Sequence, residues 1–142
     1  MVHLDIKREN VIISKIGEDY QVQIIDFGSA RRYIKGKKKF VVNGGTELSA
    51  CKERYTGTKI VGPEAADIFS LGVFLYLMIF EAFPFETVEQ IMSKDEVKLP
   101  EIMNKPENRA IRELLMNTLV KRPSNRWNIN QVLASDWLKQ KD

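Results

Sequence analysis

The chain has 142 residues, of which 44% are hydrophobic and 29% are charged, and its formal net charge is +3. This composition is that of an ordinary globular domain and excludes extended disorder. The mild charge balance argues against nucleic acid as a partner, and no apolar run is long enough to cross a bilayer.

The first third of the chain predicts a β-hairpin followed by a long loop. Two short apolar runs, residues 11–13 and 22–25, flank a polar stretch at residues 17–19. This alternation favours two antiparallel strands joined by a turn. Residues 26–62 show poor periodicity and many Gly, Lys and Thr residues. Because irregular segments of this length are uncommon in compact domains, we expect this one to be functional.

The remainder predicts helices around one central helix. Residues 63–80 form an apolar segment with Pro63 near its start, and from Ile68 onward nearly every face is hydrophobic. A helix of this kind is expected to be surrounded by protein. Further helices are predicted at residues 87–92 with Thr87 as N-cap, at 108–120, and at 128–134 with an Asn128/Gln131 capping box. The predicted fold is α+β, mostly α, with a short β-hairpin and a central buried helix.

A first polar constellation lies just before the predicted hairpin. Asp5, Lys7 and Asn10 occupy a turn that leads into residues 11–13. Phosphoryl transfer needs such a set, because a carboxylate accepts the attacking hydroxyl's proton, a lysine balances phosphoryl charge and an amide oxygen binds a metal. Taken alone, the same residues also fit an ordinary polar loop.

A second constellation, Asp26-Phe27-Gly28, follows the second predicted strand. A carboxylate at a strand end can hold Mg²⁺ while the glycine lets the backbone turn away. Since the two constellations flank one hairpin, Asn10 and Asp26 are expected to approach each other and share a metal site.

Together these motifs resemble the catalytic loop and the metal-binding loop of protein kinases. The pattern His-x-Asp-x-Lys-x-x-x-Asn, beginning at His3, is followed in order by Asp-Phe-Gly. Lys7 stands where serine/threonine kinases have it, and the wider sequence looks most like PAS-domain-containing kinases of the calmodulin-dependent-like group. The resemblance implies a protein-kinase-like C-terminal lobe over residues 1–138 and a tail at 139–142.

The resemblance also implies ligands and roles. ATP and Mg²⁺ would be the cofactors, and a protein Ser/Thr hydroxyl would be the substrate. Asp5, Lys7 and Thr46 would be catalytic, with the Thr46 hydroxyl bridging the other two. The nucleotide would be held by Asn10, Ile12, Ile25 and Asp26, and the metal by Asn10 and Asp26.

Several other residues receive structural roles from the same resemblance. His3 and Phe27 would stack in a hydrophobic column, and His3 is interpreted as a satisfied core histidine without proton chemistry. Asp67 would bind the backbone of the catalytic loop. Glu53 and Arg126 would form an ion pair.

Position 4 departs from the kinase pattern, because Leu4 replaces the arginine that receives an activation-loop phosphate. Between Gly28 and Thr46 the only hydroxyls are Ser29 and Tyr33. We therefore expect any activity to be independent of such a phosphate. Mass spectrometry that detected an activating loop phosphate would contradict this expectation.

A second departure is that Ala-Pro-Glu has become Cys51-Lys52-Glu53. The lost proline is expected to loosen this turn, while the retained glutamate keeps its ion pair. Cys51 is interpreted as incidental rather than reactive. The basic run at residues 35–39 is interpreted as a solvated loop rather than a phosphate- or acid-binding patch.

The sequence contains neither a Gly-rich phosphate loop nor a strand lysine paired with a helix glutamate. We therefore expect the N-terminal lobe to be absent and the chain alone to be inactive. The alternative to a kinase is a catalytically inactive, pseudokinase-like interaction module, with a partner protein covering an exposed face of the central helix. The single cysteine and the lack of an apolar signal segment lead us to expect a cytoplasmic or nuclear location.

Overall fold

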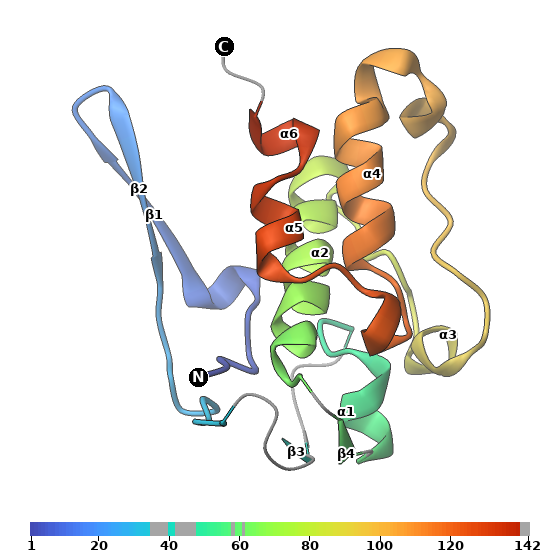
Figure 1. The fold of residues 1–142 in the computed structure, drawn as a ribbon. Helices are drawn as coiled ribbons and strands as arrows, with labels where there is room; N and C mark the ends of the chain where they lie inside the picture. Colours follow the sequence, from blue (N-terminus) through green and yellow to red (C-terminus); the bar gives the residue numbers. More distant parts are fainter. Residues whose placement is uncertain (35–39, 42–47, 58, 61, 140–142) are drawn as a thin grey trace.

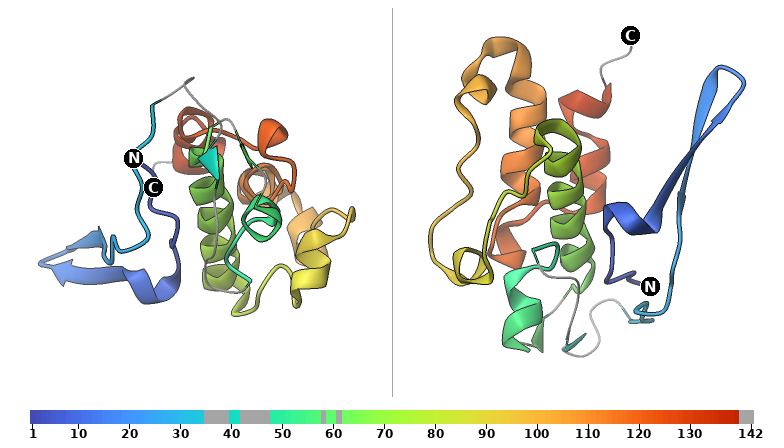
Figure 2. Two further views of the ribbon diagram at one scale, coloured as in Figure 1. Left: turned by 90° about the horizontal axis from the view of Figure 1, so that it is seen from below. Right: turned by 180° about the vertical axis from the view of Figure 1, so that it is seen from behind.

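The computed structural model describes residues 1–34, 40–41, 48–57, 59–60 and 62–139. Figure 1 shows a body of helices packed around α2 (Glu64–Phe80), with a two-stranded hairpin standing beside it. The two views in Figure 2 show the same separation between hairpin and helices. The predicted mixture of helices with a β-hairpin and a central helix is therefore observed.

The hairpin forms where the alternating apolar runs predicted it. A 3-10 turn, η1 (Arg8–Asn10), leads into β1 (Val11–Ile16), which pairs in antiparallel register with β2 (Asp19–Ile24). The pairing closes from Val11↔Ile24 to Ile16↔Asp19, which leaves a two-residue turn. Gly17 in that turn has φ 64°, a left-handed conformation that glycine adopts without steric cost. Both strands extend several residues beyond the predicted apolar runs.

Both faces of the hairpin expose apolar side chains. Adjacent residues of a strand point to opposite faces, yet Ile12 is 43% exposed and Ile13 is 52% exposed. The other large apolar residues of the hairpin that are exposed are Ile16, Tyr20, Val22 and Ile24. A hairpin buried on one face would show alternate exposure, so this hairpin presents apolar surface in two directions.

The segment predicted as a long irregular loop contains short regular elements. α1 (Lys52–Thr56) is a single helical turn that ends at Gly57 with φ 59°. β3 (Phe40–Val41) pairs with β4 (Lys59–Ile60) in a second small antiparallel sheet. Elements this short carry too few residues for a periodic signal, which is why the sequence pattern did not reveal them.

Helix α2 lies at the centre of the core, as predicted, but it is not enclosed. Pro63 occupies its N-cap position, and Phe69 and Val73 are almost completely buried. Near its C-terminal end Met78 and Ile79 are 57% and 40% exposed. Met78 and Ile79 thus leave part of the helix open to solvent, as the expectation of an exposed face on the central helix requires, while Tyr76, Leu77 and Phe80 nearby pack against the core.

Shorter helices surround α2 on its other sides. They follow in the order α3 (Val88–Met92), η2 (Glu101–Asn104), η3 (Pro106–Asn108), α4 (Arg109–Thr118), η4 (Pro123–Asn125), α5 (Ile129–Leu133) and α6 (Asp136–Lys139). The predicted N-caps are confirmed, since the Thr87 hydroxyl accepts from the Gln90 amide and Asn128 and Gln131 form a reciprocal capping box. The elements of this region that were not predicted are α6 and the three short 3-10 helices η2, η3 and η4.

Helices α2 and α4 approach each other most closely at Gly72. A Cβ built on Gly72 would lie 2.6 Å from the Thr118 Oγ1 and 3.1 Å from a methyl carbon of Leu119. Thr118 is fully buried and its hydroxyl donates to the Leu114 carbonyl at 2.8 Å, so it has little room to move. Glycine at this position therefore sets the spacing of the two helices.

We expect Gly72→Ala to lower the free energy of unfolding by about 1–3 kcal/mol, because overpacking outweighs the helix propensity that alanine adds. Urea denaturation followed by circular dichroism measures the change. Met78→Ala, an exposed site on the same helix, serves as control and should change stability by less than about 0.5 kcal/mol. A Gly72→Ala protein as stable as the parent would show that α2 and α4 do not make this contact.

No helix in the described part of the chain combines the length and apolarity needed to cross a membrane.

Candidate active site

Three of the predicted site residues lie together in the loop before the hairpin. The side chains of Lys7 and Asn10 both contact the Asp5 carboxylate. Lys7 Nζ lies 3.1 Å from Asp5 Oδ2. Asn10 Nδ2 donates to the same Asp5 oxygen at 3.1 Å and to the Asp5 carbonyl at 2.8 Å. The side chains of Asp5 and Lys7 are 16% and 21% exposed, so the pair is partly accessible from solvent. The 3-10 turn η1 creates this geometry by bringing Asn10 back toward Asp5.

The backbone of this loop is anchored by Asp67, in the first turn of α2. Its two carboxylate oxygens accept from the amides of His3 and Leu4, each at 2.7 Å. Leu4 has φ 67°, a left-handed conformation that costs a non-glycine residue about 1–2 kcal/mol. Two hydrogen bonds to a charged acceptor offset this cost and hold the residue next to Asp5 in place. The predicted role of Asp67 is confirmed.

We expect Asp67→Asn to lower the free energy of unfolding by about 2 kcal/mol, because an amide accepts at one atom only and leaves a backbone N–H unpaired. Hydrogen exchange of the Leu4 amide, measured by NMR, should accelerate in parallel. Asp136→Asn in the first turn of α6 is the matched control and should leave Leu4 exchange unchanged. Unaltered Leu4 exchange in Asp67→Asn would refute the anchoring role.

A second anchor, Arg54, was missed by the sequence reasoning. It projects from α1, is 5% exposed, and donates through Nη1 to the Leu4 carbonyl. Its Nε is buried without a hydrogen-bond partner among the described residues. Burial lowers the pKa of Arg54, while Cys51, Asp5 and Asp67 act in the opposite direction. No sequence signal pointed to it, because a basic residue in a one-turn helix is usually solvated.

Asp26 lies at the base of the hairpin, at the same end as Asn10. The Ile25 amide donates to the Asn10 carbonyl at 2.9 Å, which joins the two segments directly before Asp26. Asp26 has φ 61°, and its carboxylate accepts from the Gly28 amide at 3.1 Å. The structure thus brings the Asn10 and Asp26 segments together, and the hydrogen bond described for the Asp26 carboxylate is the one to Gly28.

His3 and Phe27 are in contact as predicted, but edge to face rather than stacked, with ring centroids 4.9 Å apart and an interplanar angle of 65°. Both ring nitrogens of His3 have partners, because Nδ1 accepts from the Asp5 amide at 3.3 Å and Nε2 lies 3.1 Å from the Ile25 carbonyl. The tautomer with its proton on Nε2 satisfies both contacts. His3 is 6% exposed, so it is a buried histidine whose ring contacts join the loop to the hairpin, as predicted.

Two predicted nucleotide-contacting residues are on the hairpin surface. Ile12 on β1 is 43% exposed and Ile25, after β2, is 38% exposed, so both side chains are available to a ligand. Thr46, predicted to bridge Asp5 and Lys7, lies outside the described residues, as does the basic run at 35–39.

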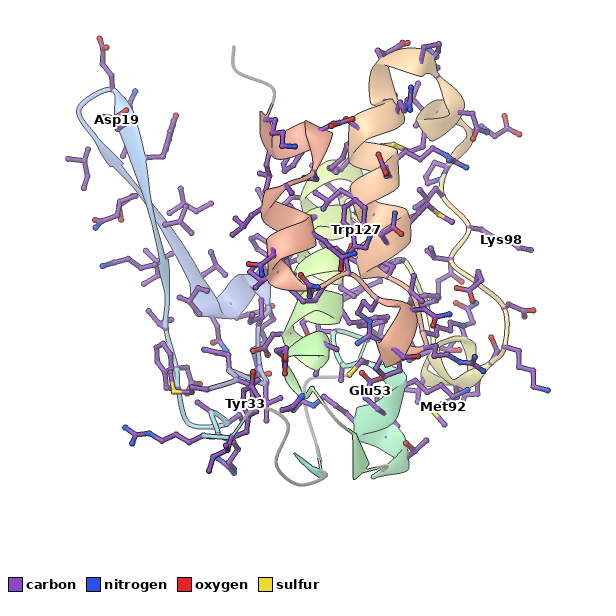
Figure 3. All side chains as sticks on the ribbon, in the orientation of Figure 1. Asp19, Tyr33, Glu53, Met92, Lys98 and Trp127 are labelled. Carbon is purple, nitrogen blue, oxygen red and sulfur yellow. The ribbon has the colours of Figure 1, made fainter. Side chains whose placement is uncertain are left out.

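The predicted Glu53–Arg126 ion pair is present and buried. Arg126 Nη1 lies 2.8 Å from Glu53 Oε1, and the guanidinium also donates to the carbonyls of Ala65, Val120 and Lys121. This pair ties α1 to the segment after α4, so the retained glutamate keeps its ion pair as predicted. Figure 3 shows Glu53 at α1, in the lower part of the helical body.

Cys51 packs in the core beside this ion pair. Its side chain is 0% exposed, and burial raises the pKa of its thiol well above the ordinary value, assisted by the charge of Glu53. A buried, protonated thiol is a poor nucleophile, which agrees with the interpretation that Cys51 is not a reactive residue.

Asn10 and Asp26 carry oxygen atoms of the kind that Mg²⁺ prefers as ligands. Because Asn10 donates through Nδ2, its Oδ1 remains an acceptor, and the Asp26 carboxylate supplies a second oxygen ligand. Among the described residues no group of three or more His, Cys, Asp and Glu side chains gathers to hold a metal. Magnesium usually binds through one or two protein oxygens together with water and substrate phosphates. Two oxygen ligands, from Asn10 and Asp26, are therefore a sufficient number for a magnesium site of this type.

Comparison with known proteins gives the same family as these motifs. Residues 1–138 match the model of the protein kinase domain. A mouse PAS domain-containing serine/threonine-protein kinase is 35% identical over 140 residues, which are 99% of this chain and 9% of that protein. A probable serine/threonine-protein kinase KIN1 homolog of Encephalitozoon cuniculi is 33% identical over 150 residues, covering 99% of this chain and 24% of the relative.

A third relative is the serine/threonine-protein kinase PSK2 of Saccharomyces cerevisiae, which is 35% identical over 141 residues, 98% of this chain and 12% of that protein. The chain thus spans at most a quarter of the length of these relatives while matching them along nearly all of its own. With the geometry of its loops and the match over residues 1–138, this chain belongs to the protein kinase domain family.

Proposed function

We propose that this chain is the C-terminal lobe of a protein serine/threonine kinase catalytic domain and contributes the loop that directs ATP γ-phosphate transfer to a protein hydroxyl. The observation that carries the proposal is the Asp5 carboxylate, which contacts both Lys7 and Asn10. This arrangement supports the proposal because it places a potential base, a cation and an amide within contact of one another. Asp67 and Arg54 fix the backbone of this loop from two separate helices.

Each residue then has a defined part. The Asp5 carboxylate orients the attacking hydroxyl and accepts its proton. Lys7, 3.1 Å from that carboxylate, faces the position where phosphoryl charge develops and balances it. The Thr46 hydroxyl is proposed to bridge the two. Because all three act by positioning and charge, small displacements of the loop are costly for the reaction.

Asn10 and Asp26 are proposed to hold Mg²⁺, and Ile12 and Ile25 to contact the adenine. The ion, when bound, neutralises phosphate charge and draws the phosphates to this end of the hairpin. The apolar exposure of Ile12 and Ile25 supports this assignment, because a purine ring would cover both. The chain contains no Gly-rich phosphate loop, so we propose that it does not catalyse efficient transfer by itself.

One observation favours a second function, that of a catalytically inactive interaction module. Met78 and Ile79 on α2 and both faces of the hairpin present apolar side chains to solvent. We propose that a partner protein or another polypeptide segment covers this surface, which would otherwise favour aggregation. We further propose a cytoplasmic or nuclear location, where ATP and protein substrates are available.

A melting-temperature titration of the 142-residue chain with Mg-ATP separates the two functions. A chain that binds Mg-ATP should be stabilised by about 2.7 kcal/mol at 100 times the dissociation constant. Asp26→Asn should weaken the response, because it removes a charged metal ligand. Asp19→Asn, at the hairpin tip labelled in Figure 3, removes a carboxylate far from the loop and should respond as the parent does. If the melting temperature of the parent chain does not change on addition of Mg-ATP, this chain does not bind the nucleotide. That result would favour the interaction module.

A further inference from the structure

A pocket of about 760 Å³ lies between α1, the end of α3 and the segment that follows α4. Figure 1 and the right-hand view of Figure 2 show these three segments meeting at the same end of the helical body. It shares no residue with the loop around Asp5. Its charged lining consists of Lys52, Lys94, Lys121, Arg122, Glu53 and Glu96.

Three cations reach this pocket from three different elements. Lys52 is the first residue of α1, Lys94 follows α3, and Arg122 precedes η4. Lys52 is half-buried, while Lys94 and Arg122 are exposed at the rim. Within the part of the chain that the structure describes, the side chains of these three residues form no ion pair. Their charges therefore remain available to an anion.

Lys121 also lines the pocket, and its ammonium lies toward a neighbouring pocket that is lined by Phe85 and Gln90. It is 7% exposed, and its ammonium donates to the Gln90 carbonyl and, at 3.0 Å, to the Ser93 hydroxyl. The ammonium also lies 4.8 Å from the centre of the Phe85 ring. The carbonyl and hydroxyl groups that accept hydrogen bonds from the ammonium are neutral. They hold the ammonium in position but do not neutralise its positive charge.

The acidic residues nearby do not neutralise this set. Glu53 lies in the wall, but it is already paired with Arg126. Glu96 is exposed at the rim, and Asp95 beside it also faces Lys121. The lining therefore carries four positive charges against one unpaired carboxylate, with Asp95 as a second acid nearby. Such an excess in a concave site attracts anions.

We propose that this pocket, called here the phosphate pocket, binds the phosphomonoester of a phosphorylated serine or threonine in a polypeptide segment. Lys52, Lys94 and Arg122 form charge-assisted hydrogen bonds to the phosphate oxygens. The volume of the pocket greatly exceeds that of one phosphate group. Val120 and Pro123 make part of its wall apolar, and this part can contact the peptide residues on either side of the phosphorylated one. A recognition site of this kind binds a segment that is already phosphorylated, which goes beyond the proposed transfer reaction.

Lys52→Pro is the sharpest variant for testing the phosphate pocket. Proline is favoured at the first helical position, where no intrahelical bond is lost. The preceding Cys51 has φ −71° and ψ 160°, the extended conformation that a following proline requires. The substitution thus removes one charge while preserving α1. Arg122→Ala provides a second variant from a different element, and Lys105→Met removes an exposed charge elsewhere.

The measurement is fluorescence anisotropy of a labelled alanine–glycine peptide carrying one central phosphoserine, titrated with the 142-residue chain. The unphosphorylated peptide should bind at least about tenfold more weakly. Lys52→Pro and Arg122→Ala should each weaken binding about fivefold, and Lys105→Met should not. Circular dichroism verifies that each variant is folded. Inorganic phosphate should compete only weakly.

Two results would overturn the proposal. Equal affinity for the phosphorylated and unphosphorylated peptides, or an equal loss in Lys105→Met and Lys52→Pro, would show that no specific pocket reads the phosphate. Inorganic phosphate that binds as tightly as the peptide would overturn the assignment to a polypeptide. Neither result depends on ATP binding or phosphoryl transfer, so failure here is distinct from failure of the proposed function.

Discussion

Replacing Arg126 by methionine is expected to lower the free energy of unfolding of this chain by about 3–5 kcal/mol, the largest stability effect among the variants considered. The substitution leaves the Glu53 carboxylate buried, at 4% exposed, without its cation. It also removes the donor to the carbonyls of Ala65, Val120 and Lys121 and the contact of the guanidinium with the Phe69 ring at 5.0 Å. A buried carboxylate without a partner costs far more than the ion pair itself contributes.

Urea denaturation followed by circular dichroism measures this loss. Arg112→Met, an exposed arginine on α4, is the matched control and should change stability by less than about 0.5 kcal/mol. Adding Glu53→Gln to Arg126→Met should recover part of the loss, because the uncompensated charge is then gone. If Arg126→Met were no less stable than Arg112→Met, the buried ion pair would not be a major stabilising contact.

Asp5→Asn is expected to lower kcat for phosphotransfer about 100- to 10,000-fold in any active kinase that contains this chain. Asparagine matches aspartate in size but cannot accept the hydroxyl proton, and it loses the ion pair with Lys7. The Asn10 and Asp26 oxygens remain, so the KM for ATP should change little. This prediction rests on the proposed function.

A phosphotransfer assay with labelled ATP and a Ser/Thr-containing protein measures the effect of Asp5→Asn. Asp19→Asn removes the same chemical group at the hairpin tip and should retain the parent rate. Activity of Asp5→Asn within twofold of the parent would exclude Asp5 as the base. In that event the cluster of Asp5, Lys7 and Asn10 would have a structural role only.

Local sequence signals predicted those parts of the fold that depend on neighbouring residues. The hairpin followed from two short apolar runs that flank a polar turn at residues 17–19, and the Asn128 cap followed from residues three positions apart. These features depend on backbone preferences and short-range hydrogen bonds, which a single segment carries within itself. The short elements α1, β3, β4 and α6 were missed because they span too few residues for periodicity to appear.

The candidate site was partly predictable for a different reason. Asp5, Lys7, Asn10 and Asp26 were found from an ordered motif, which a sequence records directly. Arg54 was not, because its importance comes from reaching the Leu4 carbonyl fifty positions earlier in the chain. The phosphate pocket likewise joins residues from three separate segments, so no local pattern could reveal it.

The sequence by itself determined the family, the order of the loops around Asp5 and Asp26, and the helix that forms the centre of the core. Only the tertiary structure decided which surfaces stay exposed and which charges meet. Exposure of Met78 and of both hairpin faces depends on whether another element lies over them, and apolar residues look alike in a sequence whether covered or not. Convergence of Lys52, Lys94 and Arg122 depends on distances through space, which chain order does not encode.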